Sequence, residues 1–116
     1  MKLKATVALV SLFATFITAF SSSAIAAGDA ARGQTLYAVC GACHGANGEG
    51  LEALGSPALA GQEEWYVVRQ LQNFKNGIRG KDPRDIYGMQ MAPMAMTLPT
   101  DQSMEDVAAY ISTLGD

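Results

Sequence analysis

Two cysteines and a histidine lie within five consecutive residues of this chain. Cys40 and Cys43 stand three positions apart, and His44 follows directly. The chain has no other cysteine or histidine, so this segment holds all of its thiol and imidazole chemistry. Two thiols at this spacing can add to the two vinyl groups of haem as thioethers, while the next residue presents its imidazole to the iron. The motif therefore predicts one covalently attached haem c.

Other cysteine and histidine sites fit this sequence less well. A thioredoxin-like redox pair follows a strand in a βαβ unit, and no such pattern surrounds Cys40. A structural zinc site needs four ligands, whereas this segment offers three donors. A catalytic cysteine–histidine pair would leave the second cysteine without a role. A disulfide between Cys40 and Cys43 would close only a very short loop, so a disulfide framework is not expected.

The N-terminus has the three parts of a secretory signal peptide. Two lysines come first, then an apolar run over residues 5–20, then small residues at Ala24 and Ala26. The apolar run has about 16 residues, fewer than the roughly 20 that a membrane-spanning helix needs. We therefore expect a signal peptide over residues 1–26 that is cleaved after Ala26, and export to the periplasm.

The predicted mature chain, residues 27–116, forms a small acidic domain of about 90 residues. Loss of Lys2 and Lys4 shifts the net charge from −3 to about −5. This charge argues against nucleic acid or an anionic membrane surface as a partner. A chain of this size buries a modest core and often recruits a cofactor. We expect a single domain with no membrane span after cleavage.

Three segments show the 3.6-residue periodicity of helices: residues 28–40, 62–77 and 100–115. The first and last begin with capping residues, Asp29 and Thr100. The middle segment ends at a glycine, as helices often do. No alternating strand pattern extends beyond a few residues. The predicted fold class is therefore all-α.

Glycine and proline predict loops over residues 41–61 and 78–100. The second of these segments carries three prolines and a cluster of four methionines, Met89, Met91, Met94 and Met96. A fifth, Met104, lies on the apolar face of the last predicted helix, where core packing is the expected role.

The whole mature sequence resembles the class I cytochromes c, from Gly28 to Leu114. The resemblance rests on "CGACHG", "SPALAGQ", "WYVVRQLQNFKNGIRG", "MAPM" and "DVAAYISTL". The chain looks most like one half of the dihaem cytochromes of the c-four type, and like haem domains of bacterial terminal-oxidase subunits. The resemblance implies a small single-domain cytochrome c fold, with crossed N- and C-terminal helices around one haem. It also implies a one-electron carrier rather than an enzyme.

The resemblance assigns roles to several further residues. It places Gly33 where the first and last helices approach each other. It makes the Pro57 carbonyl the acceptor of a hydrogen bond from His44 Nδ1, which would orient the imidazole. It also places Gln62, Trp65 and Arg79 near the haem propionates.

The sixth iron position decides between electron transfer and ligand chemistry. Since the single histidine is used by the motif, a methionine is the expected ligand. Pro93 disfavours helix for the residue before it, so Met94 is expected in an extended loop that crosses the haem. The resemblance also places the ligand on a loop about this far before the last helix. Met94 is the first choice, and Met91 is the second.

The predicted function is that of a soluble periplasmic carrier with one haem c and His44 and Met94 as axial ligands. It would move single electrons between respiratory redox proteins, a donor and an acceptor, as a monomer in weak transient complexes. The alternative is a haem enzyme or sensor with an open or labile sixth position, such as a peroxidase-like protein.

Overall fold

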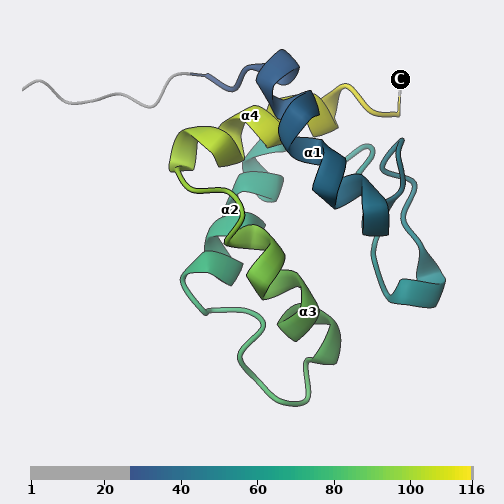
Figure 1. The fold of residues 1–116 in the computed structure, drawn as a ribbon, viewed down its shortest axis with the longest axis vertical. Helices are drawn as coiled ribbons and strands as arrows, with labels where there is room; N and C mark the ends of the chain where they lie inside the picture. The colour runs from purple at the N-terminus through teal and green to yellow at the C-terminus, as the bar shows by residue number, and fades with distance from the viewer. Residues whose placement is uncertain (1–26, 116) are drawn as a thin grey trace, which may run out of the picture.

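The computed structural model describes residues 27–115 (Figure 1). Its helices are α1 (Ala30–His44), the 3₁₀ helix η1 (Glu52–Leu54), α2 (Glu64–Lys75), α3 (Ile86–Ala95) and α4 (Asp101–Ser112). Within the described residues the only β pairing is an isolated bridge between Leu51 and Ser56. The all-α prediction is thus confirmed. The predicted signal peptide, residues 1–26, lies outside the described residues, and no helix of residues 27–115 has the length and apolarity to cross a bilayer.

Helix α1 lies across α4, as the crossed-helix prediction requires (Figure 1). A Cβ atom at Gly33 would stand 1.9 Å from the Asp106 carbonyl oxygen, so only glycine permits this approach. The Tyr37 ring packs on Tyr110 of α4, with 5.2 Å between ring centroids. The expected role of Gly33 is confirmed.

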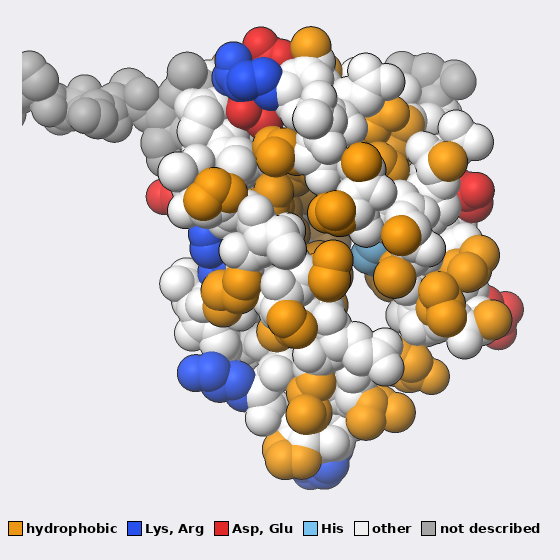
Figure 2. Space-filling model, viewed as in Figure 1, with side chains coloured by type: hydrophobic (Ala, Val, Ile, Leu, Met, Phe, Trp, Pro, Cys, Tyr) orange, Lys and Arg blue, Asp and Glu red, His pale blue; other side chains and the backbone are white. Residues whose placement is uncertain are grey.

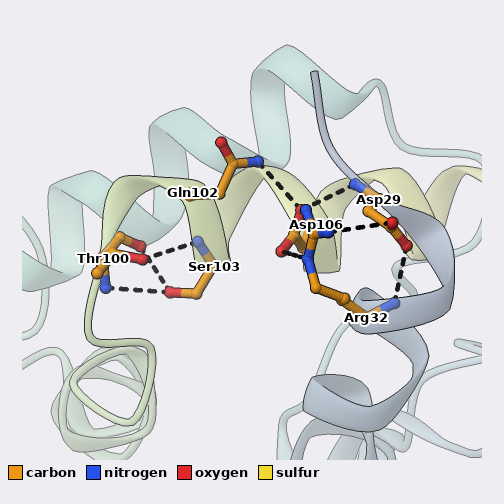
Figure 3. Close-up of polar contacts among 6 residues, drawn as sticks. All are labelled: Asp29, Arg32, Thr100, Gln102, Ser103 and Asp106. Carbon is orange, nitrogen blue, oxygen red and sulfur yellow. Dashed lines mark hydrogen bonds and ion pairs between the residues drawn. The ribbon is translucent and has the colours of Figure 1, made fainter. Parts of the chain in front are cut away.

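Both expected caps are present at the start of these two helices. The Asp29 carboxylate accepts a hydrogen bond from the Arg32 backbone N–H at 3.0 Å. Thr100 and Ser103 form a capping box, in which each side chain accepts from the other residue's backbone N–H (Figure 3). The caps satisfy N–H groups that a helix start otherwise leaves unpaired.

A buried carboxylate joins α1 to α4 (Figure 3). Asp106 is 3% exposed and accepts from Arg32 Nε at 2.9 Å and from Arg32 Nη2 at 3.0 Å. It also accepts from the Asp29 backbone N–H at 2.8 Å and from Gln102 Nε2 at 3.1 Å. The hydrogen bonds from Arg32 hold the pKa of the Asp106 carboxyl far below its usual range. Asp106 is therefore ionised, and it fixes α1 against α4.

The core lies where α2 meets α4. The α2 contribution follows helical spacing, with Val67, Val68, Leu71 and Phe74 buried. The α4 contribution includes Met104, Val107, Ala108 and Ile111. Met104 is 1% exposed, which confirms the expected packing role. Ala95 and Leu98, at the end of α3 and just after it, complete this core.

The prediction of a loop over residues 78–100 is wrong in its second half, because α3 occupies Ile86–Ala95 with Pro93 inside it. Asp85 caps this helix by accepting from the Gly88 N–H at 2.9 Å. Met, Gln and Ala favour helix, and Pro93 lies near the C-terminal end, where its missing N–H and its ring disturb only the last turns. Packing of Met91, Ala92 and Ala95 on the core adds to these preferences and stabilises the helix despite the proline. Met94 therefore lies on a helix and not in an extended loop.

Candidate functional site

One cavity of about 410 Å³ brings together most of the residues singled out in the sequence, among them Cys40, Cys43, His44 and Pro57. Its walls come from the end of α1, residues 54–59, α2, α3, Leu98 and α4. Figure 2 shows this face as hollowed, with hydrophobic side chains around the opening and pale-blue histidine atoms beside it. The volume is within the usual range for cofactor sites. A flat cofactor with a largely apolar body fits such a cavity.

The last turn of α1 supplies the thiols and the imidazole. Cys40, Cys43 and His44 all line the cavity, because spacings of three and four residues share one helix face. Cys40 packs against the core, and burial raises the pKa of its thiol. Cys43 is exposed and His44 is 7% exposed. The two sulfurs thus differ in surroundings but border the same space.

The His44 imidazole is oriented by a backbone carbonyl. His44 Nδ1 lies 2.7 Å from the Pro57 oxygen. A carbonyl oxygen can only accept, so Nδ1 carries a proton and donates it. In the tautomer with its proton on Nδ1, Nε2 holds the lone pair that can bind a metal.

The segment that carries Pro57 is fixed by its own backbone hydrogen bonds. The Gly48 carbonyl accepts from the N–H groups of Leu59 at 2.8 Å and Ala60 at 3.0 Å. Gly50 N–H donates to the His44 carbonyl at 2.7 Å. Gly48 and Gly50 have φ values of 66° and 81°, which favour glycine. This network sets where the Pro57 oxygen meets the imidazole.

A phenol ties the end of α1 to the interface with α4. The Tyr37 hydroxyl donates to the Gly45 carbonyl, directly after His44, at 2.8 Å. Burial raises the pKa of Tyr37 to about 12, so the hydroxyl keeps its proton and remains a donor. Because Tyr37 also packs on Tyr110, the position of His44 depends on α4 as well as on α1.

Two of the four candidate methionines line the cavity. Met91 and Met94 border it, whereas Met89 and Met96 do not and are 46% and 54% exposed. Met91 packs against the core, while Met94 is 37% exposed. The two stand three residues apart on α3 and share a helix face. Of the four methionines considered as iron ligands, these two are the ones that border the cavity.

Polar side chains also border the cavity, among them Gln62, Gln70 and Arg79. Arg79 Nη1 donates to Gln70 Oε1 at 2.8 Å, and its guanidinium lies 4.4 Å from the centroid of the Phe74 ring. Arg79 is the one cationic residue of this lining, which suits a cofactor with carboxylates. Trp65, expected near the propionates, is not part of the lining.

Sequence reasoning did not assign several cavity residues from α2. Tyr66, Gln70 and Phe74 line the cavity together with Gln62, at successive intervals of four residues. That interval marks one face of a helix and was available in the sequence. Taken together, the thiols, the oriented imidazole, the two sulfurs on α3, the cation and the apolar walls fit a haem group.

Comparisons with known proteins agree with this chemistry. The family model described as "Cytochrome c" matches residues 30–115. The chain is 43% identical over 106 residues to cytochrome c4 of Stutzerimonas stutzeri, a match that covers 90% of this chain and 49% of that protein. It is 37% identical over 87 residues to cytochrome c-554(548) of Halomonas halodenitrificans, covering 75% of this chain and 98% of that protein.

A solved structure is similar as well. The crystal structure of reduced recombinant cytochrome c4 from Pseudomonas stutzeri superposes with a TM-score of 0.61 at 45% identity. The match covers 76% of this chain and 46% of that one. The chain therefore spans about half the length of the cytochrome c4 relatives that it matches.

Proposed function

Because this chain belongs to the cytochrome c family and carries one covalently bound haem c, we propose that it is a soluble periplasmic electron carrier. It passes single electrons between redox proteins of a respiratory chain and is not an enzyme. The observation that carries this proposal is the cavity that Cys40, Cys43 and His44 share with the sulfurs of Met91 and Met94. When bound, the haem supplies a one-electron iron couple.

Three residues of α1 and Pro57 would hold the haem. Cys40 and Cys43 would each hold the haem through a thioether, the product of adding the thiol S–H across a vinyl group. His44 Nε2 would bind the iron. The hydrogen bond to Pro57, at 2.7 Å, fixes the ring orientation and raises the basicity of that nitrogen.

The proposed second axial ligand is a methionine of α3. The sequence favours Met94, but that preference relied on an extended loop after Pro93, whereas these residues are helical. Burial favours Met91, because a side chain already packed on the core loses less freedom when it binds. We therefore place Met91 first and Met94 second. A methionine on the iron closes it to other ligands and favours electron transfer.

Substitution of the methionines tests the ligand and the function together. We expect Met91→Ala to lose the absorption band of methionine-to-iron charge transfer, to lower the reduction potential and to bind carbon monoxide. Met94→Ala should keep the band, as should the control Met89→Ala, whose exposed side chain lies outside the cavity.

Three results would each count against part of this assignment. Loss of the band in Met94→Ala alone would show that the burial argument chose the wrong sulfur. Rapid carbon monoxide binding by the unaltered protein would show an open iron and contradict a closed electron carrier. Irreversible redox titration would contradict the carrier role itself.

The proposed export can be checked on the mature protein. The N-terminal pattern supports cleavage after Ala26, which leaves residues 27–116 as one haem domain. Protein from the periplasmic fraction should begin at Ala27, and its intact mass should equal that peptide plus one haem. Retention of residues 1–26, or a mass that lacks haem, would contradict this processing.

A further inference from the structure

A second hollow lies beside α2, outside the haem cavity. This open depression of about 840 Å³ is bordered by residues 61–65, by α2 further along, and by α4. Gln62 is the one residue that it shares with the haem cavity. Trp65, the single tryptophan of the chain, lines it and is 57% exposed. We call the surface of Glu63, Glu64, Trp65, Arg69 and Glu105 the Trp65 face.

Two aromatic rings connect this face to the haem cavity. Tyr66 lines the cavity and is itself 39% exposed. The rings of Trp65 and Tyr66 meet edge to face, with 5.9 Å between their centroids. Electron tunnelling slows steeply as the gap between redox groups widens. A partner that contacts Trp65 would therefore touch a ring that packs on Tyr66, which is a residue of the cavity wall.

The charges around Trp65 are mainly negative. Glu63, Glu64 and Glu105 border the depression, against the single cation Arg69. The Arg69 guanidinium lies 4.9 Å from the centre of the Trp65 ring, and the Ser112 hydroxyl donates to Glu64 at 2.9 Å. These contacts hold the aromatic ring and one carboxylate in place. A basic partner surface complements such a face.

The mouth of the haem cavity offers a different surface. The large side chains of its lining are mostly apolar or aromatic, among them Val39, Leu54, Tyr87 and Met94. The Trp65 face instead combines a central tryptophan with carboxylates, and exposed tryptophans are frequent anchors of protein interfaces. The two surfaces therefore suit partners of different chemistry.

We propose that the Trp65 face is a docking surface for a redox protein that presents a basic rim around an apolar centre. This inference rests on the proposed electron-carrier function and adds a route for the electron, through Trp65 and Tyr66. The contact would be small and transient, as is usual for electron-transfer complexes.

The test uses the reduced haem-loaded protein and a lysine-rich mitochondrial-type cytochrome c as the basic electron acceptor. Stopped-flow mixing at low salt gives the second-order rate constant. We expect Trp65→Ala to lower this constant by about tenfold, the effect of losing one interface anchor. Trp65→Phe keeps an aromatic ring and should lose less. The control Ile78→Ala truncates a side chain that is 72% exposed and borders neither hollow, so it should change the rate little.

A charge reversal tests the electrostatic part separately. Glu63→Lys should slow the same reaction and flatten its dependence on ionic strength. Glu52→Lys makes the same change in net charge on η1, away from the Trp65 face, and should have a clearly smaller effect.

Small-molecule oxidation separates the two proposals. With ferricyanide, Trp65→Ala, Trp65→Phe and Ile78→Ala should react within about twofold of the unaltered protein, a change below about 0.5 kcal/mol. Because ferricyanide is an anion, Glu63→Lys and Glu52→Lys should both speed its reaction, and by similar factors. Failure of the unaltered protein to react reversibly with ferricyanide would contradict electron transfer itself. Suppose instead that Trp65→Ala reacts normally with ferricyanide and also reduces the basic acceptor as fast as the unaltered protein does. This result would contradict docking at the Trp65 face and leave the electron-carrier function standing. Equal slowing by Glu52→Lys and Glu63→Lys would show that net charge, not this face, steers the partner.

Discussion

The interface of α1 with α4 and the surroundings of α3 are held by different kinds of interaction. Between α1 and α4, the backbones meet at Gly33, and Arg32 binds the buried carboxylate of Asp106. Helix α3 instead borders the haem cavity, and much of its apolar surface is exposed, including Ile86 at 58% and Tyr87 at 56%. One region is complete as protein, whereas the other is completed by the haem that its cavity would hold.

The size of the cavity shows how much the second region depends on its cofactor. The cavity of about 410 Å³ is open to solvent, so without haem its apolar walls would stay in contact with water, which forgoes about 25 cal/mol for each Å² of apolar surface. A small domain is stable by only about 5–15 kcal/mol, so the loss of this burial is large for such a chain. Without haem, therefore, the walls around the cavity are not expected to keep this arrangement, even where α1 and α4 retain their contacts.

Removal of both thiols should have the largest effect on folding of all the substitutions considered, because it removes the haem from the cavity region. Cys40→Ser/Cys43→Ser prevents thioether formation, so the mature chain should carry no haem after acid–acetone extraction. Because the haem supplies much of the core, we expect circular dichroism to show a largely unfolded chain. A well-folded variant with a cooperative thermal transition would contradict the view that the cavity region depends on haem.

Substitution of Gly33 tests the region that is complete as protein. In Gly33→Ala, the new Cβ would meet the Asp106 carbonyl and the Tyr110 side chain, at 1.9 Å and 2.8 Å. Helix α1 must move away from α4, and we expect a loss of about 3 kcal/mol in chemical denaturation of the haem-loaded protein. Gln34→Ala, one residue along on the exposed side of α1, is the control and should change stability by less than about 0.5 kcal/mol.

Asp106 allows the same interface to be tested with pH. Asp106→Asn should cost about 2 kcal/mol at pH 7, because charge-assisted hydrogen bonds from Arg32 are lost. Arg32 lowers the folded-state pKa of this carboxyl, so its contribution is full above the unfolded pKa of about 3.9 and falls at lower pH. The stability difference between the two proteins should therefore be flat near neutrality and shrink below about pH 4. A difference that grows on acidification would contradict this sign.

Substitution of Lys75 should have the smallest effect on stability. It should also change the rate at which carbon monoxide binds to the iron. Its Nζ donates to the Leu98 carbonyl at 2.5 Å, which ties the segment after α3 to α2. Lys75→Met should cost about 1 kcal/mol and speed carbon monoxide binding, since α3 is held less firmly. Lys81→Met removes an equal charge from an exposed lysine and is the control. Equal carbon monoxide rates in the two variants would show that this hydrogen bond does not position α3.

The elements with clear local signals were predicted well from the sequence. Asp29 and Thr100 cap α1 and α4 as expected. Of the apolar residues whose spacing predicts α2, Val68, Leu71 and Phe74 are buried, whereas Trp65 is exposed. The "CGACH" segment predicted the cofactor because the residue types and their spacing determine that chemistry locally. In these segments, local preference and tertiary packing favour the same structure.

Helix α3 and the polar interface were not predicted, for different physical reasons. Pro93 predicts an extended loop, but it lies near the C-terminal end of α3, Asp85 caps the start, and Met91 and Ala95 pack on the core. The bond between Arg32 and Asp106 joins residues 74 positions apart, and nothing in the sequence pairs them. The family resemblance predicts Trp65 near the haem propionates, whereas the four-residue interval of Gln62, Tyr66, Gln70 and Phe74 leaves it on another face.

The paired hydrogen bonds that the Gly48 carbonyl accepts bear on the speed of electron exchange. They fix the segment that carries Pro57, and through it the imidazole of His44. An atom held by a network of short-range backbone bonds moves little when the charge of a neighbouring group changes. We therefore expect a small inner-sphere reorganisation energy on the histidine side of the haem. Any structural adjustment between the oxidised and reduced forms should concentrate on the opposite side, along α3.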